Sequence, residues 1–264
     1  MIEPVENIAG YQLSTQNARA CVTDIMSWVK NEKQVSKGNK NCRWLACMNP
    51  HSYAVARHDR VFSQALHSAD WLIPDGAGVI FASKLLGGNI HERVTGSDIF
   101  QGVLEELNNI GGYRVFFLGS TDQTLAAIRA RMAVDYPNLQ VVGMYSPPFK
   151  PVYSQIELEA MIEVINDAKP DVLWVGMTAP KQEKWIFENC TRLNVKFAGA
   201  IGAVFDFYTG QVRRSHPFFQ RMGLEWLPRL IQQPRRLWRR MFISAPIFVW
   251  HVLRQRWNCR IHKQ

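Results

Sequence analysis

Residues 71–86, WLIPDGAGVIFASKLL, contain the repeating unit from which the fold is predicted. Trp71 to Ile73 is a short apolar run, typical of a buried strand, and Val79 to Leu86 has the composition of a helix. Between them lies Asp75, followed directly by Gly76. A carboxylate here either caps the helix or accepts a proton from a substrate, and the local pattern is compatible with both roles.

The same strand pattern recurs along the chain. Five further runs are continuously apolar, as is typical of parallel strands that helices cover on both faces. These runs are RWLACM (43–48), RVFFLG (114–119), LQVVGMY (139–145), DVLWVGM (171–177) and VKFAGA (195–200).

Amphipathic segments separate these runs. Helices are predicted over residues 97–109 and 121–135, and a third begins at Ser154, where Glu157 completes a capping box, and ends before Pro170. Alternation of strands and helices predicts an α/β fold, with a doubly wound, mostly parallel, Rossmann-like sheet.

Composition is that of an ordinary globular protein. Of 264 residues, 47% are hydrophobic and 20% charged, so we expect a buried core and no global disorder. The five cysteines show no CxxC spacing, which argues against a disulfide framework or zinc site and suits a reducing cytosol. The N-terminal sequence does not resemble a signal peptide, and no run of about 18 apolar residues predicts a membrane-spanning helix.

Positive charge is concentrated at the C-terminal end. The chain has a formal net charge of +9, whereas residues 212–264 contain eleven Arg, one Lys and one Glu, a balance of +11. The preceding residues therefore carry a balance of −2. We predict an α/β domain over residues 1–211 and a helical, basic and aromatic appendage over 212–264.

Polar and small residues follow the predicted strands. In a parallel sheet, ligands bind in the loops outside the carboxyl ends of the strands. Each of these loops combines a small residue with a polar group, so we expect a ligand at this edge. The loops are CMNPHS, IPDGAG, FLGSTD, VGMTAPKQ and GAIGAVFD.

Two of these loops are candidates for phosphate binding. Gly119 and Ser120 lie where a strand turns into a helix, and the amide groups of a helix N-terminus favour an anion, although simple capping explains them equally well. After Gly176, Pro180 fits the first helical position, so Lys181 falls in the first turn, where a cation is unfavourable unless an anion offsets it. Neither loop is a P-loop, and no GxGxxG follows the first strand.

The last loop pairs Gly202 with Asp206. This carboxylate could accept hydrogen bonds from a ribose or a base, and a role as a turn or cap residue is as well supported by the pattern.

Six motifs follow one another along the chain: IPDGAGVI, ERVTGSD, FFLGS, VGMTAPKQEKW, GAVFDFYTG and GLEWLPRLIQQPRRLWRR. In this order they resemble the WecG/TagA/CpsF family of bacterial glycosyltransferases over about residues 43–240. The resemblance implies a metal-independent, inverting enzyme without a cofactor, which moves a sugar from a UDP-sugar to a polyprenyl-diphosphate-linked acceptor. It also implies a peripheral position on the inner face of the bacterial cell membrane, in the synthesis of cell-wall, capsule or exopolysaccharide polymers.

The resemblance also implies site residues. Asp75 matches the family's proposed base, and Arg93 matches an arginine near the leaving group, with an ion pair to Glu92 or Asp98 as its structural alternative. Gln182 matches a glutamine near the sugar and base, and Asn49 matches the asparagine of the family's T-x-N-P motif. The expected nucleotide-sugar contacts are Gly76, Gly119, Ser120, Gly176, Lys181, Gly202 and Asp206.

Two departures from the family pattern affect the expected specificity. Cys47 replaces the usual threonine, and a thiol is a weak hydrogen-bonding group for a substrate. His51 replaces an acidic residue that often follows the proline, and a lone histidine is more often structural than catalytic. The chain has no DxD motif for a metal, and no second acid is paired with Asp75 by motif, so a two-carboxylate retaining mechanism is not favoured.

The basic tail interleaves arginine with Trp, Phe, Leu and Ile, a composition that suits an anionic membrane surface. Arg213, Arg214 and Arg221 are candidates for contacts with the leaving group or with the membrane. Two alternatives are a nucleic-acid-binding tail, which the high apolar content disfavours, and packing on the body or on a second subunit of a homo-oligomer.

The resemblance thus implies a UDP-sugar-dependent hexosyltransferase with N-acetylmannosamine as the expected sugar. Glucose and N-acetylmannosaminuronic acid are alternative donors. A non-catalytic protein that binds a nucleotide-sugar or a nucleic acid is the alternative of a different class.

Overall fold

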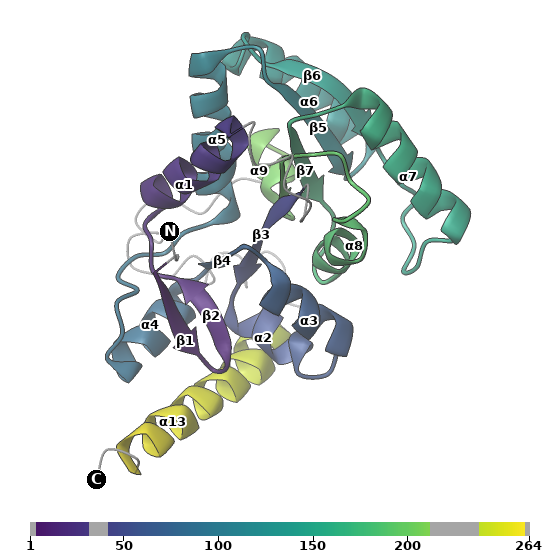
Figure 1. Cartoon of the computed structure of the whole chain (residues 1–264). Coiled ribbons are helices and arrows are strands. Elements are labelled where there is room, and N and C mark those ends of the chain that lie inside the picture. Colours follow the sequence, from purple (N-terminus) through teal and green to yellow (C-terminus); the bar gives the residue numbers. More distant parts are fainter. Residues whose placement is uncertain (1–3, 32–41, 212–237, 262–264) are drawn as a thin grey trace.

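The computed structural model describes residues 4–31, 42–211 and 238–261 (Figure 1). A six-stranded parallel sheet organises them, with its strands in the order β4-β3-β8-β7-β5-β6. The predicted doubly wound α/β class is therefore confirmed. The strands are β3 (Arg43–Met48), β4 (Trp71–Pro74), β5 (Arg114–Gly119), β6 (Gln140–Tyr145), β7 (Val172–Gly176) and β8 (Phe197–Ala200).

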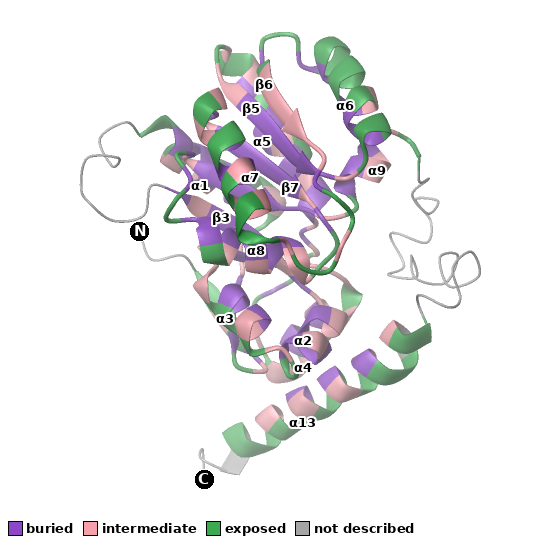
Figure 2. Ribbon diagram, turned by 90° about the vertical axis from the view of Figure 1, so that its right-hand side faces the viewer, coloured by how far each residue is buried: buried purple, intermediate pink, exposed green. Residues whose placement is uncertain are grey.

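Helices cover both faces of this sheet, and each face has its own hydrophobic core, with the central strands buried between them (Figure 2). One face carries α1 (Ala18–Lys30), α5 (Gly96–Ile110), α6 (Asp122–Asp135) and α9 (Val204–Tyr208). The other face carries α2 (Pro50–Ala56), α3 (Arg60–Ser68), α4 (Ala77–Leu86), α7 (Gln155–Ala168) and α8 (Lys181–Asn189).

The predicted helices lie within about two residues of those observed, with the largest difference at α4, which begins at Ala77 where Val79 was predicted. Thr95 and Thr121 cap α5 and α6, and Ser154 with Glu157 forms the predicted capping box of α7. One prediction about burial is wrong: no residue of β6 is fully buried. Because β6 lies at the edge of the sheet, it lacks the second neighbour that covers a central strand.

An antiparallel hairpin precedes the sheet and was not predicted. It joins β1 (Val5–Ile8) to β2 (Tyr11–Ser14) through Ala9 and Gly10, both with positive φ, at 52° and 95°. Such a two-residue turn matches the twist of the flanking strands. Its Tyr11 ring is buried in the core that also contains residues of α2, α3 and α4.

The C-terminal segment packs on the body. A π-helical turn, η2 (Arg240–Ser244), leads into α13 (Ala245–Ile261), which contacts α2 and α4. Phe248 is 1% exposed, and its ring meets that of Tyr53 edge-on at 5.3 Å. Gln255 accepts a hydrogen bond from Ala9 N at 2.7 Å, which ties α13 to the hairpin.

The division of the chain at residue 212 stays a prediction, because residues 212–237 lie outside the described residues. None of the described helices combines the length and apolarity needed to cross a bilayer.

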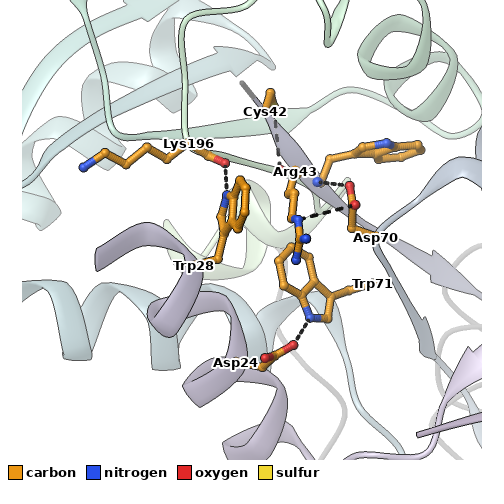
Figure 3. A network of polar contacts seen from close by, with 8 residues as sticks. Asp24, Trp28, Cys42, Arg43, Asp70, Trp71 and Lys196 are labelled. Atoms are coloured by element: carbon orange, nitrogen blue, oxygen red, sulfur yellow. Dashed lines mark hydrogen bonds and ion pairs between the residues drawn. The ribbon is translucent and has the colours of Figure 1, made fainter. Parts of the chain in front are cut away.

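A polar network ties α1 to the amino edge of the sheet (Figure 3). Arg43, at the start of β3, lies 3.8 Å from Asp70 and 4.0 Å above the Trp28 ring. The indole of Trp71, at the start of β4, donates to Asp24 at 2.9 Å. These contacts are structural, and they lie at the edge opposite to the carboxyl ends of the strands.

Candidate functional site

The loops at the carboxyl edge are joined by backbone hydrogen bonds. The amide of Asp75, after β4, donates to Met48 O at the end of β3 at 2.8 Å. The amide of Ser120, after β5, donates to Gly176 O at the end of β7 at 3.1 Å. Because neighbouring strand ends are fixed to one another, the polar residues that follow them form one surface.

Asp75 stands at the junction of β4 and α4. The N-cap of α4 is Gly76, with φ of 100°, so Asp75 is not the N-cap that the alternative reading required. A φ of 100° strains any residue with a side chain, which explains the glycine. The Cβ of Asn49 lies 4.0 Å from where a Cβ on Gly76 would be, so Asn49 and the Asp75 turn are neighbours.

Cys47, near the end of β3, is within electrostatic reach of three carboxylates. Burial raises the pKa of its thiol well above the usual range, and the negative charges of Asp75, Glu183 and Asp98 raise it further. The thiol is therefore neutral and not a nucleophile at neutral pH. These three carboxylates come from the loop between β4 and α4 and from the first turns of α5 and α8.

Asn49 is the N-cap of α2. Its Oδ1 accepts hydrogen bonds from the amides of His51 and Ser52, at 3.0 and 2.9 Å. Within the described part of the chain, its Nδ2 makes no hydrogen bond. The cap therefore fixes the amide in one orientation and leaves its donor group for another partner.

We expect Asn49→Asp to preserve the fold and weaken transfer of the substrate group roughly 10- to 100-fold. Aspartate caps a helix as well as asparagine does, but it lacks the donor, and a hydrogen bond to a charged group contributes about 1.5–3 kcal/mol. Initial rates and thermal melting measure the two effects. The matched control is Asn17→Asp, because Asn17 caps α1 through the same group. Equal rates for both variants would contradict a substrate contact of Asn49.

Gln182 and Glu183 occupy the first turn of α8 and are 4% and 2% exposed. Gln182 Oε1 accepts from Gly202 N, and its Nε2 donates to Glu183 Oε1, both at 2.9 Å. These bonds hold the Gln182 amide in one orientation. The N-cap of α8 is Pro180, so the helix begins one residue later than predicted, at Lys181.

Glu183 was not among the predicted site residues. Burial raises its pKa to about 7, and its Oε2 has no hydrogen-bond partner in the described part of the chain. The helix dipole favours an acidic residue in the first turn of a helix at the protein surface. The sequence pattern therefore does not indicate that Glu183 is buried.

Lys181 faces the loop that follows β6. Its Nζ lies 3.8 Å from the centre of the Tyr153 ring and donates to Lys150 O at 2.5 Å. Burial lowers the pKa of this ammonium group. Its predicted contact with an anion stays a prediction.

Close packing accounts for two of the predicted glycines. A Cβ on Gly119, which has φ of 112°, would lie 2.6 Å from Gly176 O, and a Cβ on Gly176 would lie 2.3 Å from the Phe205 ring. Ser120 has φ of 59°, a strained conformation for serine that often marks functional loops. Nucleotide binding by this loop stays a prediction.

Arg93 is half-buried in the loop between α4 and α5. The amide of the next residue, Val94, donates to Pro74 O at 3.1 Å, so this loop runs beside the strand end that precedes Asp75. Asp206 lies half-buried in α9. Arg213, Arg214 and Arg221 lie outside the described residues.

His51 joins the site loop to the C-terminal segment. Its Nδ1 lies 2.9 Å from Ser244 Oγ in η2. Burial, with a smaller contribution from Arg240, lowers the pKa of His51 to about 4. The imidazole is therefore neutral at pH 7, which favours the structural reading of this residue.

We expect stability to fall as the pH drops from 6.5 to about 4, in part through His51. In this range the unfolded chain binds a proton that the folded imidazole does not, so acid favours unfolding. Urea unfolding at pH 7.5 and pH 5 should show a smaller pH dependence for His51→Gln than for the unsubstituted protein. His58→Gln changes an exposed histidine nearby and is the control; an unchanged pH dependence in His51→Gln would contradict the assignment.

In the described part of the chain, no three His, Cys, Asp or Glu side chains gather in an arrangement that could hold a metal ion. The cluster around Cys47 combines carboxylates with amides and a neutral thiol, which suits hydrogen bonding to a polar substrate.

The model of the glycosyl transferase WecG/TagA/CpsF family matches residues 6–262. The chain belongs to this family. It is therefore a glycosyltransferase by family, as the sequence motifs indicated.

Named relatives share one activity. A protein of Bacillus spizizenii is 31% identical over 232 residues, with 88% of this chain and 87% of the relative covered. A protein of Bacillus subtilis is 30% identical, with 81% and 80% covered, and one of Staphylococcus aureus is 25% identical, with 87% of each chain covered. All three are named N-acetylglucosaminyldiphosphoundecaprenol N-acetyl-beta-D-mannosaminyltransferase.

Proposed function

We propose that this protein transfers N-acetylmannosamine from a UDP-sugar to a sugar linked through diphosphate to a polyprenyl lipid. The transfer inverts the anomeric carbon and requires no metal ion. The enzyme acts as a peripheral protein on the inner face of the bacterial cell membrane. The acceptor class and the sugar follow the names of the relatives, which transfer N-acetylmannosamine to an N-acetylglucosamine-diphosphate lipid.

The observation that carries the proposal is the cluster around Cys47. The charge of the Asp75 carboxylate raises the pKa of the Cys47 thiol. The side-chain amide of Gln182 is fixed by its hydrogen bond with Gly202, and the side-chain amide of Asn49 is fixed because it caps α2. A carboxylate supplies a base, and amides in fixed orientations supply hydrogen bonds to hydroxyl or phosphate oxygens.

The proposed reaction is a single displacement. Asp75 accepts the proton of the acceptor hydroxyl while that oxygen forms a bond to the anomeric carbon of the donor. The bond between this carbon and the diphosphate oxygen breaks, and its electron pair leaves with UDP. Arg93 is proposed to offset the charge on the departing diphosphate, together with Arg213, Arg214 and Arg221, which lie outside the described residues.

A panel of donors tests the proposal. UDP-N-acetylmannosamine, UDP-glucose and UDP-N-acetylmannosaminuronic acid are each incubated with a lipid-linked N-acetylglucosamine diphosphate, and UDP release is measured with and without the acceptor. We expect release that depends on the acceptor, fastest with UDP-N-acetylmannosamine. Faster UDP release with another donor in the panel would identify that donor's sugar as the one transferred and would leave the proposed reaction unchanged.

Binding without turnover is the outcome that would overturn the enzymatic proposal. UDP binding is measured by calorimetry in the same preparation. A protein that binds UDP and releases none from any donor in the panel would be the non-catalytic nucleotide-sugar-binding protein of the alternative reading.

A further inference from the structure

Helix α13 is buried along one side and exposed along the other (Figure 2), and both sides carry large apolar residues. Phe248 and Val252 face the body and are each 1% exposed. On the outer side, Trp250, Leu253 and Trp257 are 65%, 45% and 70% exposed. An apolar side that solvent reaches is unfavourable for an isolated molecule and marks a surface for a further contact.

The charge of this segment restricts the choice of partner. Residues 238–261 contain five arginines and no Asp or Glu. In the described part of the chain, neither Arg254 of α13 nor Arg57, at the end of α2, forms an ion pair with a carboxylate. The partner of this surface must therefore be apolar in part and negatively charged in part.

A groove lies where these features meet. Its volume is about 520 Å³, and it separates the end of α2 from α13. Arginine flanks it on both helices, and an exposed indole forms part of its wall. The groove is lined by Arg57, Pro246, Ile247, Trp250, His251 and Arg254.

We propose that this groove binds the phosphate group of an anionic glycerophospholipid in the membrane. The guanidinium groups of Arg57 and Arg254 bind the phosphate oxygens, and Trp250 with Ile247 packs against the glycerol and the first carbons of the acyl chains. The outer side of α13 then lies in the interfacial layer of the bilayer.

The groove also sets the distance between the membrane and the site. Arg57 follows the last residue of α2, and Asn49 precedes its first. This helix has 7 residues, which corresponds to a length of about 10 Å. A phosphate in the groove would place the bilayer surface about one short helix away from Asn49, within reach of a sugar that is joined to its lipid by a diphosphate. In this respect the inference rests on the proposed function.

Binding of the full-length protein to lipid vesicles tests the groove. We expect sedimentation with vesicles of mixed phosphatidylglycerol and phosphatidylcholine, and little with phosphatidylcholine alone. The double variant Arg57→Gln/Arg254→Gln should bind the mixed vesicles roughly 30-fold more weakly, from two arginines at about 1 kcal/mol each. Trp250→Ala should also weaken binding.

A matched double variant distinguishes vesicle binding through the groove from attraction by the net charge of the protein. Arg19→Gln/Arg129→Gln removes two exposed arginines from α1 and α6, on the opposite face of the sheet. An equal loss of vesicle binding in both double variants would overturn the groove. So would a dimer in solution that dissociates on Trp250→Ala, with no vesicle binding, because the surface would then be an interface between copies.

Transfer to a short-chain, water-soluble acceptor distinguishes this inference from the proposed function. The Arg57→Gln/Arg254→Gln variant should retain its turnover with that acceptor. Vesicle binding that depends on the groove, without transfer to either acceptor, would leave the groove in place and refute the proposed function.

Discussion

Asp75→Asn should lower the rate of sugar transfer by about 10²- to 10⁴-fold, the usual contribution of a positioned general base. The amide has nearly the same size as the carboxylate and accepts no proton at neutral pH. Affinity for UDP should change little, because the substituted group acts on the acceptor hydroxyl. Initial rates of acceptor-dependent UDP release and calorimetry with UDP measure the two quantities.

The matched control is Asp167→Asn, which makes the same change at an exposed position on α7. It should transfer sugar at the unsubstituted rate. Melting curves of both variants identify any loss of fold. Full activity in a folded Asp75→Asn variant would refute the assignment of the base, and a loss of UDP affinity equal to the loss of rate would instead make Asp75 a donor-binding residue.

Phe248→Ala should destabilise the protein by about 3–5 kcal/mol. The phenyl ring is 1% exposed and packs on Tyr53, so its removal leaves a cavity between α13 and α2. Urea unfolding measures the change. The effect is expected because the end of the chain contributes to the same core as the sheet.

Trp250→Ala is the control from the outer side of the same helix, two residues away. At 65% exposure the indole contributes little to folding, and a change within about 0.5 kcal/mol is expected. Equal, small changes in both variants would show that α13 is not held on the body in solution. The proposed lipid groove would then lose one of its walls.

Much of the fold could be predicted from the sequence, because each central strand is a continuous apolar run and three of the helices that follow strands, α2, α6 and α7, begin at a side-chain cap. The order of the strands could not, since it depends on which faces pack together after the chain has folded. The hairpin was missed because VENI is too short to show a pattern. The prediction that β6 is buried was wrong because an edge strand and a central strand have similar compositions.

The roles of the site residues stay predictions, but the sequence could indicate where some of them lie, and could not where burial depends on packing. Asp75 follows a strand in a glycine-containing loop, and the family resemblance indicated Gln182. The sequence did not indicate Glu183, because its burial depends on the fold around α8. The two sides of α13 are also indistinguishable in the sequence, since apolar residues occur all around the helix and only the structure shows which side meets α2 and α4.

The linkage of the product tests the central claim most directly. The protein is incubated with UDP-N-acetylmannosamine and a lipid-linked N-acetylglucosamine diphosphate, and the product is analysed by nuclear magnetic resonance. A single displacement primed by Asp75 predicts one added sugar whose anomeric configuration is opposite to that of the donor. A product that retains the donor configuration, or the absence of any added sugar with each of the three donors, would contradict it.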